Sequence, residues 1–156
     1  MTMACTIHDA TRAELDFIID ANAAMALETE NKVLDHARLA RGVAAVFDEP
    51  ARGFYLIAKN GDDAVGCLLV TREWSDWRDG EWWWIQSVYV SPAARRGGVF
   101  RALYAEAERR ARAAPGVVGL RLYVENDNRA AQATYAALGM HDAHYRVFEH
   151  GFLGDA

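Results

Sequence analysis

The spacing of apolar residues changes period along the chain and divides its first ninety residues into helices and strands. Two runs with apolar residues every three or four positions predict helices. The first follows a cap at Asp9 or Thr11 and continues into residues 26–30, and the second begins after Asp35 and ends before Pro50. Alternating or continuous apolar runs then predict three strands, at 53–59, 64–74 and 81–90, joined by the turn-rich segments 60–63 and 75–80.

The carboxyl-terminal half returns to helical spacing and then alternates again. Apolar residues from Phe100 to Ala114 lie on one face of a long helix that Pro115 and Gly116 end. A strand at 117–125, a short helix at 128–140 and a last strand at 141–150 complete the pattern. The predicted order is ααβββαβαβ, an α/β fold in which helices pack on a mixed sheet.

Composition and net charge narrow the number of domains, the location and the binding partners to be expected. The chain has 156 residues, 52% of them hydrophobic and 25% charged, which predicts one globular domain over 1–156. No apolar run approaches the roughly 20 residues of a membrane span, and the first residues do not resemble a signal peptide, so we expect a cytoplasmic protein without a membrane partner. A net charge of −5 argues against nucleic acid as a partner and suits a cationic substrate.

Metal chemistry has little support in the sequence. Cys5 and Cys67 belong to no CxxC pair, and His141 and His144 have no third ligand at a convincing spacing. We therefore expect no metal cofactor.

The turn between the strand at 81–90 and the long helix carries the first chemical signal. It contains Gly97 and Gly98, which have no Cβ to keep an anion from the backbone, and it is surrounded by Arg95, Arg96 and Arg101. A helix amino terminus presents unpaired N–H groups, so this turn is a candidate phosphate site. The alternative is an ordinary strand–helix turn with solvated arginines. The sequence lacks both GxxxxGK[ST] and GxGxxG, the two common phosphate-loop patterns.

Two motifs resemble the GNAT superfamily of acyl-CoA-dependent N-acetyltransferases. Residues 95–100, Arg-Arg-Gly-Gly-Val-Phe, resemble its [QR]-x-x-G-x-[GA] signature, with Phe100 in place of the usual Gly or Ala. Asn128, Ala131, Tyr135, Gly139 and Met140 match a second signature, N-x-x-A-x-x-x-Y-x-x-x-G-[FM]. The resemblance implies a mostly antiparallel GNAT-like sheet with a V-shaped splay between the strands near 84–90 and 118–125.

The resemblance also implies roles for individual residues. The backbone of Val88, Tyr89 and Val90 would pair with the pantetheine arm of acetyl-CoA as an added strand. Arg95 and the amides of Arg96, Gly97, Gly98, Val99, Phe100 and Arg101 would hold its pyrophosphate, and Asn128 would contact the coenzyme. Tyr135 would protonate the departing thiolate. On helical spacing alone, core packing is the favoured interpretation of Tyr135, and only the family resemblance reverses that preference.

The acceptor amine needs a base, because an alkylammonium ion cannot attack a thioester. The strand at 81–90 resembles that of polyamine and diamine acetyltransferases, but Gln86 stands where they commonly carry Glu, and an amide cannot accept the proton. Glu28 and Glu30 are therefore the candidate bases, with a solvated helix end as the alternative. Strand alternation places Trp82 and Trp84 on the face of Gln86 and Val88, provided that no bulge intervenes. Packing in a core or a dimer interface is the favoured interpretation of these rings, and Trp84 is the candidate for a substrate contact.

These inferences together predict an enzyme that moves an acetyl group from acetyl-CoA to the primary amine of a small molecule in a ternary complex, as a homodimer. Two alternatives remain. The chain could be a non-catalytic acyl-CoA-binding regulatory module, given Gln86 and Phe100, or it could acetylate proteins or peptides.

Overall fold

The structure is a computed structural model that describes residues 4–154. Two compact units are distinguished, one that ends at Leu122 and one that begins at Tyr123. The first unit consists of β1 (Thr6–Asp9), α1 (Leu15–Glu30), α2 (His36–Asp48), β2 (Gly53–Asn60), β3 (Asp63–Ser75), β4 (Gly80–Val90), α3 (Val99–Ala113) and β5 (Val117–Leu122). The second unit contains α4 (Arg129–Ala137).

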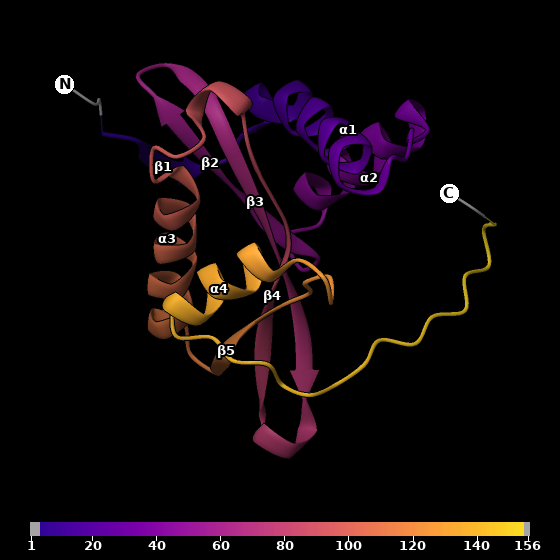
Figure 1. Ribbon diagram of the computed structural model, residues 1–156, viewed down its shortest axis with the longest axis vertical. Helices are drawn as coiled ribbons and strands as arrows, with labels where there is room; N and C mark the ends of the chain where they lie inside the picture. Colours follow the sequence, from indigo (N-terminus) through magenta and orange to yellow (C-terminus); the bar gives the residue numbers. More distant parts are fainter. Residues whose placement is uncertain (1–3, 155–156) are drawn as a thin grey trace. The chain divides into compact units, whose positions relative to one another are not determined.

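The first unit is built on a mixed sheet with the strand order β1-β2-β3-β4-β5. Strands β1 to β4 are antiparallel neighbours, and β5 runs parallel to β4. Figure 1 shows β3 and β4 as a long hairpin whose tip extends beyond the neighbouring strands. The predicted strands and helices between residues 15 and 137 all form, within a few residues of the expected ends.

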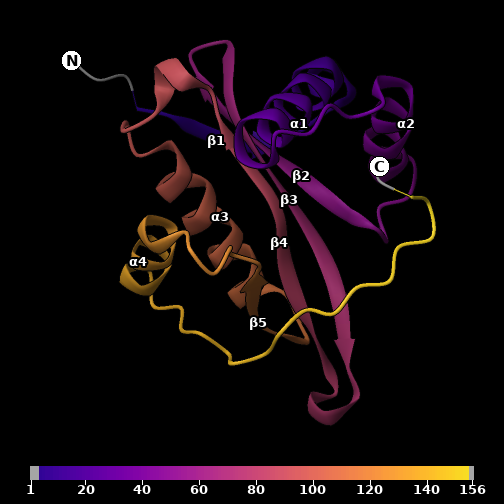
Figure 2. The same ribbon diagram turned by 45° about the vertical axis from the view of Figure 1, so that its right-hand side comes forward.

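Helices cover both faces of this sheet. One core cluster contains Ile18 and Ile19 of α1, Val43 of α2, and Tyr55 and Cys67 of the strands beneath them. The alternate strand positions face α3, where Leu103 is fully buried. Figure 2 shows α1 and α2 on one side of the strands and α3 on the other.

Capping side chains fix where the two amino-terminal helices begin. Thr11 and Glu14 form a reciprocal capping box on the short 3₁₀ turn that leads into α1, and Asp35 accepts a bond from the Arg38 amide at the start of α2. Burial by itself would raise the pKa of Glu14, but hydrogen bonds from Thr11 and the Lys59 ammonium, 3.0 Å away, lower it to about 2. Of the two expected caps, Thr11 is confirmed.

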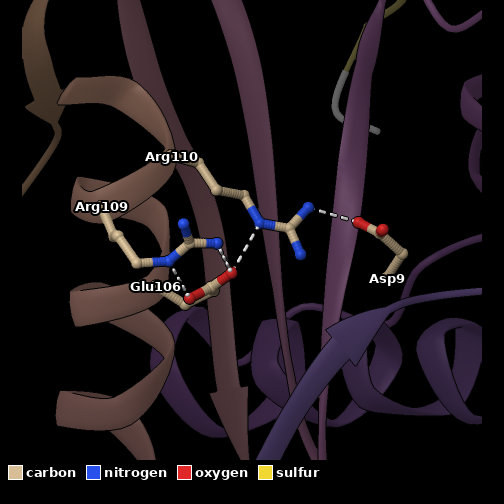
Figure 3. Close-up of polar contacts among 4 residues, drawn as sticks. All are labelled: Asp9, Glu106, Arg109 and Arg110. Atoms are coloured by element: carbon tan, nitrogen blue, oxygen red, sulfur yellow. Dashed lines mark hydrogen bonds and ion pairs between the residues drawn. The ribbon is translucent and has the colours of Figure 1, made fainter. Parts of the chain in front are cut away.

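Asp9, the other expected cap, instead ties β1 to α3. Its carboxylate is ion-paired with Arg110, which also donates to Glu106 at 2.8 Å (Figure 3). Glu106 accepts two further bonds from Arg109, and these arginines lower the pKa of Glu106 to about 2. The edge strand β1 is thereby attached to the long helix through a charged network as well as through its pairing with β2.

A bulge in β4 changes which side chains share a face. Leu69 of β3 pairs with Ser87 and Val70 pairs with Ile85, so Gln86 is an extra residue without a cross-strand partner. Trp84 lies opposite Thr71 and therefore shares its face with Ser87, not with Val88. The expectation that Trp82 and Trp84 lie on the face of Val88 is wrong, because one inserted residue reverses the alternation.

Both ends of the chain also differ from the predicted order. Strand β1 was not predicted, because its four residues are too few to establish an alternating pattern. The predicted strand at 141–150 does not form; within the described residues that segment has no regular structure, and Tyr145 and Phe148 are exposed. A strand needs a neighbour for its backbone groups, and the described part of the second unit contains no other strand.

Candidate functional site

The candidate site begins where β4 and β5 separate. Their parallel ladder runs from the pair Glu81 and Val117 to the pair Ile85 and Leu122. Beyond this point β4 continues to Val90, paired with β3 on its other edge. Because β5 ends at Leu122, residues 86–90 of β4 have an edge that β5 does not cover and to which an extended ligand can add as another strand.

The turn after β4 collects backbone N–H groups at the amino end of α3. Arg96 and Gly98 both adopt left-handed backbone conformations, with φ of 67° and 80°. No side chain caps the helix at Gly98, and within residues 4–154 no backbone or side-chain acceptor is bonded to the amides of Arg96, Gly97 or Gly98. Alternating backbone conformations of this kind form a concave anion site, and a non-glycine residue held in the left-handed region is typical of functional turns.

A hollow of about 220 Å³ lies beside this turn, lined by Val90, Ala94, Arg95, Arg96, Gly98, Val99, Phe100 and Arg101. A Cβ at Gly98 would have no atom within 4 Å, so the glycine leaves space in front of the amides. Phe100, which departs from the family signature, is half-buried, with its ring centroid 6.3 Å from that of Tyr104. The phenyl ring therefore belongs both to the apolar face of α3 and to the wall of the hollow.

Arg95 connects the turn to α1. Its Nη2 lies 2.7 Å from Oε2 of Glu28, and its Nε donates to the carbonyl oxygen of Val90 at 3.0 Å. The hydrogen bond to Glu28 raises the pKa of Arg95 further. Two residues that the sequence assigned to different substrates, Arg95 to the pyrophosphate and Glu28 to the amine, are thus in direct contact.

The other charged candidates lie on the surface of the first unit. Arg96 and Arg101 are exposed and form no ion pair within the described residues, so their guanidinium groups are available to an anion. Glu30 is the last residue of α1. Its side chain is exposed and also has no ion pair within residues 4–154. Gln86, the bulge residue, is exposed as well.

The tryptophans of the hairpin have different environments. The Trp82 ring is already contacted by two cations, with the guanidinium carbons of Arg78 and Arg121 at 5.1 Å and 4.0 Å from its centroid. Trp83 is buried and packs edge-on against Phe54, with ring centroids 5.3 Å apart. Trp84 is half-buried. These contacts favour a packing role for Trp82 and Trp83 over contact with a substrate ammonium group.

The second unit holds the second family signature, in which Asn128 and Tyr135 are the residues with an expected role. Asn128 caps α4 by accepting a bond from the Ala131 amide at 3.1 Å, which gives the asparagine a local structural role. Tyr135 is half-buried on the same helix, and burial raises the pKa of its phenol. A phenol is protonated at neutral pH even without this shift, as a proton donor requires.

The described residues add neither a metal site nor a membrane span to this picture. In the part of the chain from 4 to 154, no group of three or more His, Cys, Asp or Glu side chains is arranged to hold a metal ion. The helices of the same residues are too short or too polar to cross a bilayer.

Comparison with known proteins agrees with the class that this fold and turn define, the acyl-CoA N-acyltransferases. The model of the acetyltransferase (GNAT) family matches residues 17–140. The chain belongs to the GNAT acetyltransferase family, and it is an acetyl-CoA-dependent acetyltransferase. The resemblance noted from the two sequence motifs is thereby confirmed.

One solved structure supports the same assignment, and two more distant ones share the fold. A possible acetyltransferase from Clostridium difficile 630 is 38% identical, with a TM-score of 0.89 over 96% of this chain and 98% of that one. An aminoglycoside N-acetyltransferase in complex with CoA shares the fold at 14% identity, with a TM-score of 0.78 over 95% of both chains. An aminoglycoside acetyltransferase from an uncultured soil sample, in complex with trehalose, has 15% identity and a TM-score of 0.72 over 96% of both chains. A search of curated proteins returned no match.

Proposed function

We propose that this enzyme acetylates the primary amine of a small molecule by direct attack in a ternary complex with acetyl-CoA. The observation that carries the proposal is the uncapped turn at Gly98, which presents backbone amides to a hollow at the end of a strand with an unpaired edge. Acetyl-CoA supplies the acetyl group in activated form, as a thioester. The turn fits its diphosphate, because the amides and nearby arginines complement negative charge without a Cβ in the way.

The first unit would bind the coenzyme through its backbone. Residues 88–90 would receive the pantetheine arm along the edge of β4, and the amides of Val88 and Tyr89 would polarise the thioester carbonyl. The amides from Arg96 to Arg101 would hold the diphosphate, with the guanidinium groups of Arg96 and Arg101 at its margin. Because the pantetheine arm would be bound by main-chain hydrogen bonds, residues 88–90 need no particular side chains to bind it.

The second unit would supply the proton donor. Tyr135 would give its proton to the departing thiolate, because a phenol, whose ordinary pKa is about 10, is protonated at neutral pH. Asn128 would keep its capping role and contact the coenzyme through its remaining donors.

The acidic end of α1 would handle the amine. Glu28 and Glu30 lie in its last turn, and a net charge of −5 favours a cationic acceptor. Gln86, displaced from the ladder by the bulge, would orient the amine or a water molecule, and Trp84 would border the acceptor. The two fold neighbours named for aminoglycosides support a small, amine-bearing acceptor.

A coenzyme A release assay across a panel of polyamines, diamines, amino acids, aminoglycosides and lysine peptides tests this function. We expect amine-dependent thiol release with at least one class of small amine. Release with peptides alone would establish a protein acetyltransferase instead. Tight acetyl-CoA binding without release by any of these amines would contradict the proposed acceptor and favour the regulatory module.

The enzyme is further proposed to act in the cytoplasm as a homodimer. Trp74 and Trp77 at the hairpin tip are 65% and 88% exposed, and indoles are enriched at protein interfaces. Sedimentation equilibrium measures the mass directly, and a mass near the 17.3 kDa of one chain would contradict the dimer.

A further inference from the structure

The contact between Arg95 and Glu28 joins the turn proposed for the coenzyme to the helix end proposed for the amine. These residues are 67 positions apart in the sequence, and their charged atoms lie 2.7 Å apart. The same guanidinium donates to the carbonyl of Val90 at 3.0 Å. Arg95 therefore spans from the end of β4 to the last turn of α1, both within the first unit.

The last turn of α1 is acidic. It contains Glu28 and Glu30 but no basic residue. Acidic side chains are unfavourable at the carboxyl end of a helix, where the exposed carbonyl groups already carry partial negative charge. The helix ends at Asn31, which adopts a left-handed conformation with φ of 53°. Arg95 supplies, from a distant part of the chain, the cation that this turn does not contain.

The backbone of Arg95 directly precedes the amides of Arg96, Gly97 and Gly98. A diphosphate bound to those amides would restrict the backbone at residue 95 and hold its guanidinium against Glu28. We propose that Arg95 is a positioning residue that transmits coenzyme binding to the last turn of α1, so that the acceptor side is stabilised when the coenzyme is bound. This inference rests on the proposed function, because it needs both substrates to bind where that function places them.

The size of the coupling is limited by exposure. The Arg95 and Glu28 side chains are 46% and 41% exposed, and ion pairs as open as this one are weak. Thermodynamic coupling is reciprocal, so the free energy by which bound coenzyme stabilises the last turn of α1 equals the free energy by which that turn strengthens coenzyme binding. An effect of roughly two- to fivefold on each is expected.

Hydrogen exchange with coenzyme A as the probe tests the coupling without needing to know the amine. In the unmodified enzyme, saturating coenzyme A should slow exchange at residues 96–101 and also, by roughly two- to fivefold, at residues 27–31. Glu28→Gln leaves the Arg95 bond to Val90 in place. In this variant coenzyme A should still protect residues 96–101 from exchange but should no longer slow exchange at residues 27–31. Arg95→Met should give the same result at 27–31.

Arg112→Met is the matched control. It removes an exposed arginine that faces Glu108 at 3.6 Å on α3, and it should keep the full gain at residues 27–31. If coenzyme A protects 96–101 but not 27–31 in the unmodified enzyme, the coupling is refuted while the coenzyme site stands. The coupling is also refuted if Glu28→Gln retains the gain. If neither segment is protected, the coenzyme site itself is refuted.

Discussion

Replacing Gly98 by alanine separates the chemistry of the turn from its conformation. Gly98 has φ of 80°, and Gly116, at the other end of α3, has φ of 78°. At both positions an added Cβ would meet no atom within 4 Å. Gly116→Ala therefore imposes the same conformational strain on the backbone as Gly98→Ala. Of the two glycines, only Gly98 lines the hollow at the coenzyme turn.

The expected magnitudes follow from this geometry. Alanine in a left-handed conformation costs about 1–2 kcal/mol, so each variant should lose roughly 2–8 °C in melting temperature. The methyl group at residue 98 also obstructs the amides. Loss of one hydrogen bond to a charged oxygen, about 1.5–3 kcal/mol, predicts a coenzyme A affinity roughly ten- to a hundredfold lower.

Calorimetric titration with coenzyme A and thermal melts of both variants provide the measurement. Gly116→Ala should keep the affinity of the unmodified enzyme, whereas Gly98→Ala should lose it. Equal affinities in the two variants, with equal melting temperatures, would refute the assignment of the diphosphate to this turn.

Three further predictions concern the proton donor and the scaffold. Tyr135→Phe should lower kcat at least about tenfold with coenzyme A affinity unchanged, and undiminished turnover in steady-state assays would remove this phenol from the mechanism. The pKa of Glu14 is about 2 in the folded chain against an ordinary 4.5, so ionised Glu14 contributes at most about 3 kcal/mol to the free energy of unfolding. This contribution is present at neutral pH and is lost as the pH falls from about 4.5 to about 2. Urea midpoints of Glu14→Gln should accordingly be lower than those of the unmodified enzyme at pH 7 and converge with them towards pH 2, and an equal difference at both pH values would contradict this. Gly119→Ala places a Cβ 2.5 Å from the Trp82 ring and should lower the free energy of unfolding by about 1–3 kcal/mol in urea titrations; an unchanged midpoint would mean that the ring moves aside freely.

Local patterns predicted the helices and strands well, because most segments of the chain have apolar residues at either helical or strand spacing and not a mixture of the two. Apolar spacing is enough to locate α2 and its buried Val43, and the side chain of Asp35 marks where that helix starts. The turn at Gly97 and Gly98 was recognisable because glycines between a strand and a helix have a physical purpose there. The family signatures then assigned a ligand to it.

The errors arose where structure depends on distant partners. The bulge at Gln86 is defined only by its pairing with β3, and no local signal distinguishes it from regular alternation. The segment 141–150 alternates like a strand, but a pattern cannot supply the neighbour that a strand requires. The contact between Arg95 and Glu28 spans 67 positions, and the only hint in the sequence was an acidic last turn in α1 without a basic residue.

The central claim is that the backbone amides of the turn bind the diphosphate of coenzyme A, and amide chemical shifts report on those groups directly. ¹H–¹⁵N spectra should be recorded during titration with coenzyme A and, separately, with pantetheine, which lacks the diphosphate. We predict large downfield shifts of the Gly97 and Gly98 amide protons with coenzyme A and little change with pantetheine. If coenzyme A binds and these two resonances remain in place, the diphosphate lies elsewhere and the account is contradicted.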